Sequence, residues 1–499
     1  MRQIAREELL QRIRVENPWW AGGGVGEDLA ALAPRAYYGL LSPLVRQEGV
    51  KRAVVLMGPR RVGKTVLIHH VIQGLLDDGV EARQVAYVSV DHPLYTDLSL
   101  EDLLVLYRDA AAPDGTRPQY VFFDEVQYLK NWEVHLKSLV DSTARTKFLV
   151  SGSAAAALSL KSNESGAGRF TDFLLPPLTF YEYLELRGEA DLLQEEEVDG
   201  RRQFTAADLA TLNARFVHYL NFGGYPEVVF SEAIQADPAR FIKGDIIDKV
   251  LLRDLPSLYG ISDIQELNRL FATLAFNTAG ELSLQDLASK SGVAKNTLKR
   301  YIEYLEAAFL IRVVHRVDDT AKRFQRARAF KVYLTNPSMR SALFAPVGDR
   351  PEEVGPLAET AIFAQWFHSQ GFEPHYARWK RGEVDLVCVG PDLEAKWAVE
   401  VKWSDRYVDQ VDELAALVEF CRKNDLSGAI VTSRTMWANR NVGGVAIEFL
   451  PTAVYCFTLG YNIIHSKHDL ALSEVGSQTQ LVLDLPIEVG GGDASGSAT

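Results

Sequence analysis

Eight residues, from Gly58 to Thr65, read Gly-Pro-Arg-Arg-Val-Gly-Lys-Thr and have the G-x-x-x-x-G-K-T spacing of a phosphate-binding loop. An apolar run from Ala53 to Met57 precedes them, and a stretch of helical character begins at Val66. A strand that leads through a glycine turn to the free N–H groups of a helix start is the arrangement that binds phosphate oxygens. The segment therefore predicts a nucleoside triphosphate site formed by Gly58, Pro59, Arg60, Arg61, Val62, Gly63, Lys64 and Thr65.

A second motif supplies the acids that this chemistry needs, because an apolar run from Tyr120 to Phe123 ends in Asp124 and Glu125. The Thr65 hydroxyl is expected to bind Mg²⁺ directly and Asp124 to hold the ion through its shell, while Lys64 neutralises the β- and γ-phosphates. Glu125, the next residue after Asp124, is expected to orient or deprotonate the attacking water. The alternative is a strand that merely ends in solvated carboxylates.

A third apolar run, beginning at Lys147, ends in Ser151-Gly152-Ser153, and either serine could contact the γ-phosphate or the water. With these motifs the sequence resembles the AAA+ ATPases, specifically a bacterial and archaeal group whose ATPase carries a C-terminal nuclease-like domain. The resemblance covers most of the chain and includes Gly168-Arg169, the run from Pro176 to Phe180, and the turn Gly223-Gly224-Tyr225-Pro226. It implies ATP and Mg²⁺ as cofactors and ATP hydrolysis as an activity.

The resemblance also implies a homo-oligomer, because in such proteins an arginine, often from a neighbouring subunit, reaches the γ-phosphate. Arg169 is the candidate for this catalytic role, and Arg253 is a weaker one. The alternative for Arg169 is a surface arginine paired with Asp172 or Glu164.

A separate set of charged residues lies near the C-terminus. Side chains alternate along a strand, so Glu400 and Lys402 share one face of the run from Trp397, and Asp385 lies on the partner strand across a short turn. Two carboxylates there can converge on a divalent ion, and the lysine can position a water for attack on a phosphodiester. Taken alone, the pattern favours a salt-bridged, exposed strand over a metal site.

Together with Glu359, these residues resemble the PD-(D/E)XK nuclease superfamily. The resemblance implies that Glu359, Asp385 and Glu400 bind metal and that Glu400 and Lys402 are catalytic. Domains of this kind can keep the fold and lose cleavage, so the sequence leaves nuclease activity open.

The elements expected to position these residues give the fold class: an α/β P-loop AAA+ parallel sheet with a helical lid, a winged helix and a C-terminal α/β PD-(D/E)XK-like domain. Strands and helices alternate from Val54 to Leu178, which is typical of a parallel sheet. A helix at Ser283, a turn at Gly292, a helix at Lys295 and a strand at Phe309 follow the order of a winged helix. The predicted divisions are 1–35 (N-terminal segment), 36–180 (ATPase core), 181–278 (helical lid), 279–345 (winged helix), 346–485 (nuclease-like domain) and 486–499 (disordered tail).

Basic residues gather around the predicted winged helix. They are Lys295, Lys299, Arg300, Arg312, Arg316, Lys322, Arg323, Arg326, Arg328 and Lys331. Such a local cluster is the electrostatic footprint of a DNA-binding surface. Charge runs are also ordinary solvated faces, and winged helices also serve as protein-contact modules.

Composition limits the remaining classes. The 499 residues carry a net charge of -13, which argues against indiscriminate binding to anionic membranes. The three cysteines lie singly, as thiols of a reducing compartment do. We find no secretory signal and no run of eighteen apolar residues, so we expect a cytoplasmic protein without a membrane partner.

The sequence thus predicts an ATP-hydrolysing AAA+ protein that acts on DNA, with a possible metal-dependent nuclease activity. The alternative is a nucleotide-driven switch or scaffold that binds protein partners through a catalytically silent nuclease-like domain. The two differ in whether the C-terminal acids bind metal and cleave, and in whether DNA binding falls steeply with salt.

Overall fold

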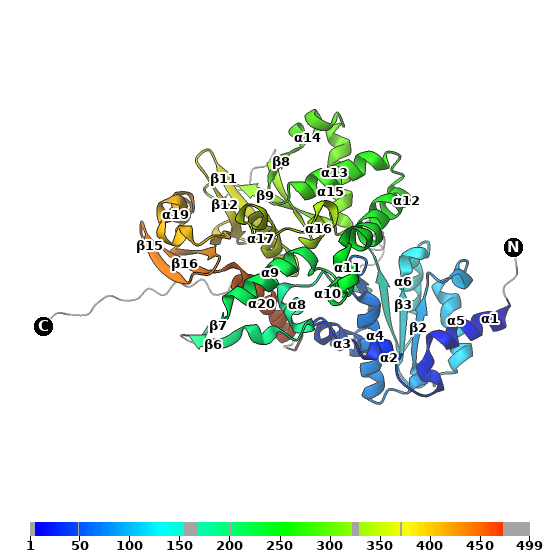
Figure 1. Cartoon of the computed structure of the whole chain (residues 1–499). Coiled ribbons are helices and arrows are strands. Elements are labelled where there is room, and N and C mark those ends of the chain that lie inside the picture. The colour runs from blue at the N-terminus through cyan, green and yellow to red at the C-terminus, as the bar shows by residue number, and fades with distance from the viewer. Residues whose placement is uncertain are drawn as a thin grey trace.

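The computed structural model describes residues 5–47, 49–153, 168–198, 201–321, 329–369 and 372–472. Two sheets organise this part of the chain, a five-stranded one in the N-terminal third and a nine-stranded one in the C-terminal half, with helices between them (Figure 1). The predicted tail 486–499 and four members of the basic cluster lie outside the described residues: Lys322, Arg323, Arg326 and Arg328.

The first sheet is parallel throughout, in the order β2-β3-β4-β1-β5, as the alternation of strands and helices predicted. Its strands are β1 (Ala53–Met57), β2 (Val85–Ser89), β3 (Gln119–Asp124), β4 (Thr146–Gly152) and β5 (Phe170–Leu174). The inner strands β1 and β3 are buried along their whole length because helices cover both faces, whereas the edge strand β5 contains Thr171 and Asp172. The helices around the sheet are α3 (Tyr38–Arg46), α4 (Lys64–Asp77), η2 (Ala82–Gln84), η3 (Pro93–Tyr95), α5 (Leu100–Ala111), η4 (Val126–Tyr128) and α6 (Trp132–Ser142). Since parallel strands end at one edge, the ends of β1, β3 and β4 meet there.

The N-terminal segment docks onto this sheet through its paired tryptophans. It comprises α1 (Arg6–Glu16), η1 (Pro18–Ala21) and α2 (Glu27–Ala30). The indole nitrogens of Trp19 and Trp20 both donate to the Val85 carbonyl of β2, at 3.0 and 2.8 Å. The described part of the predicted segment 1–35 therefore packs against the ATPase core.

The predicted helical lid, 181–278, is mostly helical but also contains an antiparallel hairpin. Its elements are α8 (Phe180–Leu186), η6 (Ala190–Leu192), β6 (Gln194–Val198), β7 (Arg201–Thr205), α9 (Leu209–Phe222), α10 (Pro226–Phe230), α11 (Glu232–Ala236), the π-helical η7 (Ala239–Asp248) and η8 (Val250–Asp254), α12 (Leu255–Tyr259) and α13 (Ile264–Phe276). Little in the sequence indicates the hairpin, because the three consecutive glutamates of β6 have low strand propensity.

The second sheet has the order β15-β16-β14-β13-β12-β11-β9-β10-β8. Its strands are β8 (Glu281–Ser283), β9 (Ile311–Val317), β10 (Ala329–Leu334), β11 (Pro374–Trp379), β12 (Gly382–Val389), β13 (Ala395–Glu400), β14 (Gly428–Ser433), β15 (Ala438–Val442) and β16 (Val445–Pro451). Its helices are α14 (Leu284–Ser291), α15 (Lys295–Ala307), α16 (Ser338–Phe344), α17 (Pro351–Trp366), α18 (Arg406–Asp409), η9 (Val411–Leu414), α19 (Ala415–Lys423) and α20 (Thr452–Leu472).

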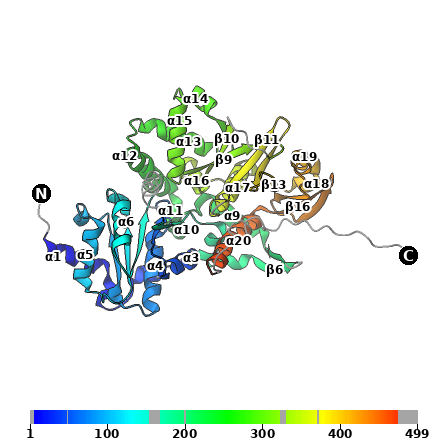
Figure 2. The ribbon, with the colours of Figure 1, turned by 180° about the vertical axis from the view of Figure 1, so that it is seen from behind.

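This sheet crosses the predicted division at residue 345. The predicted winged helix supplies β8, β9 and β10, and the predicted nuclease-like domain supplies the other strands, yet β9 pairs in parallel with β11 (His315 with His375, Val317 with Ala377). Figure 2 shows β9, β10, β11 and β13 together in this sheet, seen from behind. Segments 279–345 and 346–485 therefore share one hydrogen-bonded sheet.

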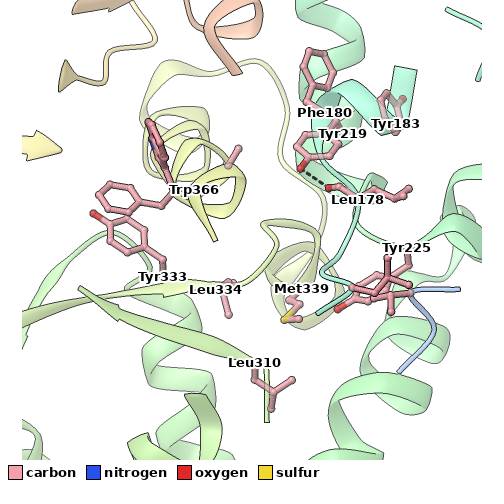
Figure 3. Packing of buried hydrophobic residues seen from close by; sticks show 14 of the residues in the cluster. Leu178, Phe180, Tyr183, Tyr219, Tyr225, Leu310, Tyr333, Leu334, Met339 and Trp366 are labelled. Carbon is pink, nitrogen blue, oxygen red and sulfur yellow. Dashed lines mark hydrogen bonds between the residues drawn. The ribbon is translucent and has the colours of Figure 1, made fainter. Parts of the chain in front are cut away.

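A common apolar core joins the lid to the second sheet (Figure 3). The Tyr219 hydroxyl of α9 donates to the Leu178 carbonyl at 2.9 Å, and the ring of Tyr333 in β10 stacks 3.9 Å from that of Phe363 in α17. At Gly224 an added Cβ would lie 2.5 Å from the Asn336 side chain, so this turn needs glycine. The three cysteines are buried and free. Among the helices described, we find none with the length and hydropathy to cross a membrane.

Candidate nucleotide site and C-terminal acidic cluster

The phosphate loop, residues 58–65, depends on two glycines. At Gly58 an added Cβ would lie 2.2 Å from the Leu175 carbonyl oxygen, and Gly63 has a φ of 92°, a conformation that favours glycine. Gly63 leads directly into α4, whose start has no side-chain cap. The first N–H groups of α4 are therefore available to an anion, as the motif predicted.

Asp124 is the centre of a hydrogen-bond network at the end of β3. It accepts from the Thr65 hydroxyl (2.7 Å), the Tyr87 hydroxyl (2.9 Å) and the Glu125 N–H (3.0 Å), and also from the Ser151 hydroxyl. No motif marks Tyr87 in the sequence; the signal is a hydroxyl within the apolar strand β2. Thr65 and Asp124 place two oxygen groups side by side, and this donor set fits Mg²⁺.

Lys64 folds back into its own loop. Its buried Nζ donates to the carbonyls of Gly58 (3.0 Å) and Pro59 (2.7 Å). Burial lowers the pKa of Lys64, although Glu125 and Asp124 oppose that shift. The ammonium group is thus held inside the cradle by weak acceptors, which phosphate oxygens can replace.

Glu125 and Ser153 lie next to this network. Glu125 has a φ of 59°, and its carboxylate accepts from the Gln127 amide. Burial raises the pKa of Glu125, while Lys64 lowers it. The Ser153 N–H donates to Gln127 Oε1 at 3.1 Å, and its hydroxyl is buried without a hydrogen-bond partner. The Ser153 hydroxyl and the Glu125 carboxylate are thus polar groups that a water or a phosphate could contact.

The two arginines of the loop bind the lid. Arg60 makes a bidentate ion pair with Asp254 of η8 (3.1 and 3.0 Å), and Arg61 pairs with Glu227 (2.9 Å) and Asp245 (3.3 Å). Arg253, the weaker arginine candidate, lies over the Tyr128 ring at 5.9 Å, close to the end of β3. Because both guanidinium groups are paired with acids of the lid, the main-chain N–H groups of Arg60 and Arg61 are the ones expected to bind phosphate.

Arg35, a buried residue outside every sequence motif, contacts the phosphate loop. Arg35 pairs with Glu182 of α8 through two hydrogen bonds, at 2.9 and 2.8 Å, and donates to the carbonyls of Val62 (3.0 Å) and Pro176 (2.8 Å). The side chains of Arg35 and Glu182 are only 5% and 1% exposed. This pair connects the phosphate loop to the start of the lid.

Arg169 lies at the other end of the sheet. The Ala53 N–H, at the start of β1, donates to the Arg169 carbonyl at 2.9 Å, whereas the phosphate loop follows the end of β1. The half-exposed guanidinium of Arg169 pairs with Asp141 at 3.1 Å, and not with Asp172. The other predicted partner, Glu164, lies outside the described residues. Arg169 therefore does not belong to the nucleotide site of its own chain.

At the second sheet, Glu359 of α17 lies near Asp385, Glu400 and Lys402, the residues on which the nuclease hypothesis rests. Lys402 Nζ lies 2.6 Å from Glu400 Oε1 and 3.4 Å from Asp385 Oδ2. The Val401 N–H also donates to Asp385 Oδ2, at 2.9 Å. A helix and two adjacent strands thus bring these groups from distant parts of the sequence to one place.

Lys331 of β10 also enters this cluster, and this corrects its predicted place on a DNA-binding surface. Its Nζ lies 2.9 Å from Glu359 Oε1, 2.8 Å from Glu383 Oε1 and 3.7 Å from Asp385 Oδ1. The Tyr333 hydroxyl donates to the same Glu359 oxygen at 2.6 Å. A single lysine in the apolar run Ala-Phe-Lys-Val-Tyr-Leu was the signal, since a charge in such a strand needs a buried partner.

We call Glu359, Glu383, Asp385 and Glu400 the acidic cluster. Burial raises the pKa of Glu359 and of Glu400 to about 7. Burial alone would raise the pKa of Asp385 as well, but Lys402 and Lys331 lower it overall. Burial would lower the pKa of Lys331, but Glu359 and the other acids raise it well above its usual range. Lys331 therefore carries its charge inside the cluster.

In this arrangement the cluster does not fit a divalent ion bound by Glu359. Among the residues that the structure describes, no three or more histidine, cysteine, aspartate or glutamate side chains are arranged to hold a metal. Ammonium groups lie where such an ion would contact the carboxylates of Glu359 and Asp385.

The remaining basic residues are divided between ion pairs and an exposed helix. Arg312 lies 4.0 Å from Glu306 and Arg316 lies 3.7 Å from Glu281, and their side chains are 39% and 28% exposed. On α15 the side chains of Lys295, Lys299 and Arg300 are more exposed, although Lys299 lies 3.7 Å from Glu303. The basic face that the structure supports is thus smaller than predicted.

A comparison of the sequence with protein families matches the segment that contains the phosphate loop. Residues 50–184 match the AAA domain family, and residues 213–350 match a domain of unknown function. An uncharacterized protein of Methanocaldococcus jannaschii is 23% identical over 349 residues, which are 68% of this chain and 73% of that protein. An uncharacterized protein of Haemophilus influenzae is 22% identical over 355 residues, or 70% of this chain and 82% of that protein.

Among solved structures, the Orc1 protein of Aeropyrum pernix in complex with DNA has 14% sequence identity and a TM-score of 0.28, and the match covers 65% of this chain and 95% of that one. This similarity is too low to support a functional argument. The family match and the geometry agree that residues 50–184 form an AAA domain with a P-loop.

Proposed function

We propose that this protein binds and hydrolyses ATP with Mg²⁺. The observation that carries the proposal is the meeting of Lys64, Thr65, Asp124 and Glu125 at the edge where β1 and β3 end. Bound Mg²⁺ would be held by Thr65 and Asp124 and would neutralise phosphate charge. Lys64 would turn from its carbonyl partners to the β- and γ-phosphates, Glu125 would orient the water, and Ser151 or Ser153 would contact the γ-phosphate or that water.

We further propose a homo-oligomer in the cytoplasm. Because Arg169 lies away from its own phosphate loop, it can approach a γ-phosphate only in a neighbouring subunit. The free, buried cysteines fit a reducing compartment. Subunit contact would thus complete the catalytic set of each nucleotide site.

DNA is the proposed macromolecular partner, through α15 and its exposed cations. Reversing two of these charges, with Lys299→Glu and Arg300→Glu, should lower affinity for duplex DNA at least about tenfold and reduce the salt slope by about 0.9 for each phosphate that is no longer neutralised. Fluorescence anisotropy across a range of salt concentrations measures both. The matched control is the same change at the exposed neighbours Arg422 and Lys423 of α19, which should leave binding nearly unchanged. Equal effects of the two pairs would contradict a specific role for α15.

The second candidate function is a nucleotide-driven switch or scaffold whose nuclease-like domain is silent, and Lys331 among the acids favours it over metal-dependent cleavage. We expect no cleavage of single-stranded, duplex or branched DNA that depends on Lys402, with Mg²⁺ or Mn²⁺ and with or without ATP. Gel assays of the wild type and Lys402→Ala measure this. Cleavage that is abolished in the variant would instead establish an ATPase-nuclease.

A further inference from the structure

The position of Lys331 suggests a role beyond that of a surface cation. Its side chain is 3% exposed and starts on β10, yet its ammonium group contacts Glu383 of β12. Strands β9 and β11 lie between these two, and neighbouring strands are about 4.8 Å apart. The lysine is therefore extended over the sheet toward the acidic cluster, and its Nζ lies 5.3 Å from the centroid of the Tyr376 ring in β11.

At its end the ammonium group has the surroundings of a bound cation. Carboxylates of Glu359 from α17 and of Glu383 and Asp385 from β12 lie around it. A divalent ion would need the same oxygens at about 2.0–2.6 Å, and an ammonium group at hydrogen-bond distance fills that space. The Tyr333 hydroxyl uses the same oxygen of Glu359 as Lys331 does, which leaves that atom with two donors.

We propose that Lys331 is the resident cation of the acidic cluster, so that Glu359 does not bind a divalent metal in the folded chain. The ammonium group takes the place of an ion between Glu359, Glu383 and Asp385, and it fixes α17 to β12. Of the carboxylates in the cluster, Asp385 and Glu400 are then left as metal ligands, and Lys402 contacts both of them. This inference does not depend on ATP hydrolysis or DNA binding.

Binding of Mn²⁺, measured by isothermal titration calorimetry without nucleotide, tests the proposal. All chains carry Asp124→Asn, so that the phosphate-loop site does not contribute. Lys331→Met should raise Mn²⁺ affinity by at least about tenfold, and adding Glu359→Gln to it should remove the gain. The matched control is Lys396→Met, which removes a lysine from an exposed ion pair in β13 and should change nothing.

Glu359→Gln alone gives the reverse test, because it should not weaken any Mn²⁺ binding that the parent chain shows. If Lys331→Met fails to fold, Lys331→Met with Glu383→Gln removes one charge of each sign and keeps Glu359, Asp385 and Glu400; this variant should show the same gain. A loss of Mn²⁺ affinity in Glu359→Gln, or no gain in a folded variant without Lys331, would overturn the proposal.

Discussion

Replacing Lys64 with alanine should reduce ATP hydrolysis by at least about 100-fold, the loss typical when a fixed donor to transition-state charge is removed. The Lys64 Nζ is buried in the phosphate loop, where it donates to the carbonyls of Gly58 and Pro59. Those acceptors fix the ammonium group inside the phosphate loop without neutralising its charge. Phosphate release at saturating Mg²⁺ and ATP measures the loss.

The control for this prediction is Lys130→Ala, which removes an exposed lysine shortly after β3 and should leave turnover unchanged. Thermal unfolding of Lys130→Ala should match that of the wild type, and Lys64→Ala should still unfold cooperatively, which shows that its loss of turnover is not a loss of the fold. Undiminished turnover in a folded Lys64→Ala protein would mean that the phosphate loop does not carry the hydrolytic activity.

The second large effect should come from Arg35→Met, which should lower the free energy of unfolding by about 3–5 kcal/mol, because it leaves the Glu182 carboxylate buried without its partner. The two side chains are 5% and 1% exposed, so water cannot replace the hydrogen bonds between them. The change also frees the carbonyls of Val62 and Pro176 that Arg35 holds. Urea denaturation measures the loss, and ATP affinity should fall with it.

Arg46→Met is the matched control, since Arg46 pairs at 2.6 Å with Asp78, whose side chain is 61% exposed. Loss of such a surface pair should cost less than about 1 kcal/mol. A double variant, Arg35→Met with Glu182→Met, should recover much of the stability, because replacing both members of a buried pair leaves no uncompensated charge. Equal losses for Arg35→Met and Arg46→Met would contradict the structural role of the buried pair.

The nucleotide site was predictable because its parts are local motifs at the ends of parallel strands. Gly58, Lys64 and Thr65 fall within eight residues, and the apolar run that ends in Asp124 predicts its own strand. Once the strands are parallel, their ends must meet, so the pairing of Thr65 with Asp124 follows. The role of Arg169 depends on a second subunit and stays a prediction.

The parts that sequence reading missed are long-range pairs of single residues. Arg35 and Glu182 are separated by 147 positions, and neither lies in a motif. Lys331 is one basic residue among ten near the predicted winged helix, and only the parallel pairing of β9 with β11 turns it toward Asp385. Periodicity gives the face of a strand but not its neighbour in the sheet, so the cluster could be predicted only without its internal cation.

The junction of β9 and β11 also determines how the chain can be divided. A fragment that begins at residue 346 would expose the whole side of β11 that normally pairs with β9, as a row of unpaired N–H and C=O groups. Such an open strand edge recruits other chains and promotes aggregation. The C-terminal fragment would also lack Lys331, and the carboxylates of the acidic cluster would then repel one another. A fragment that keeps this sheet intact therefore has to begin upstream of β8, and not at the start of α17.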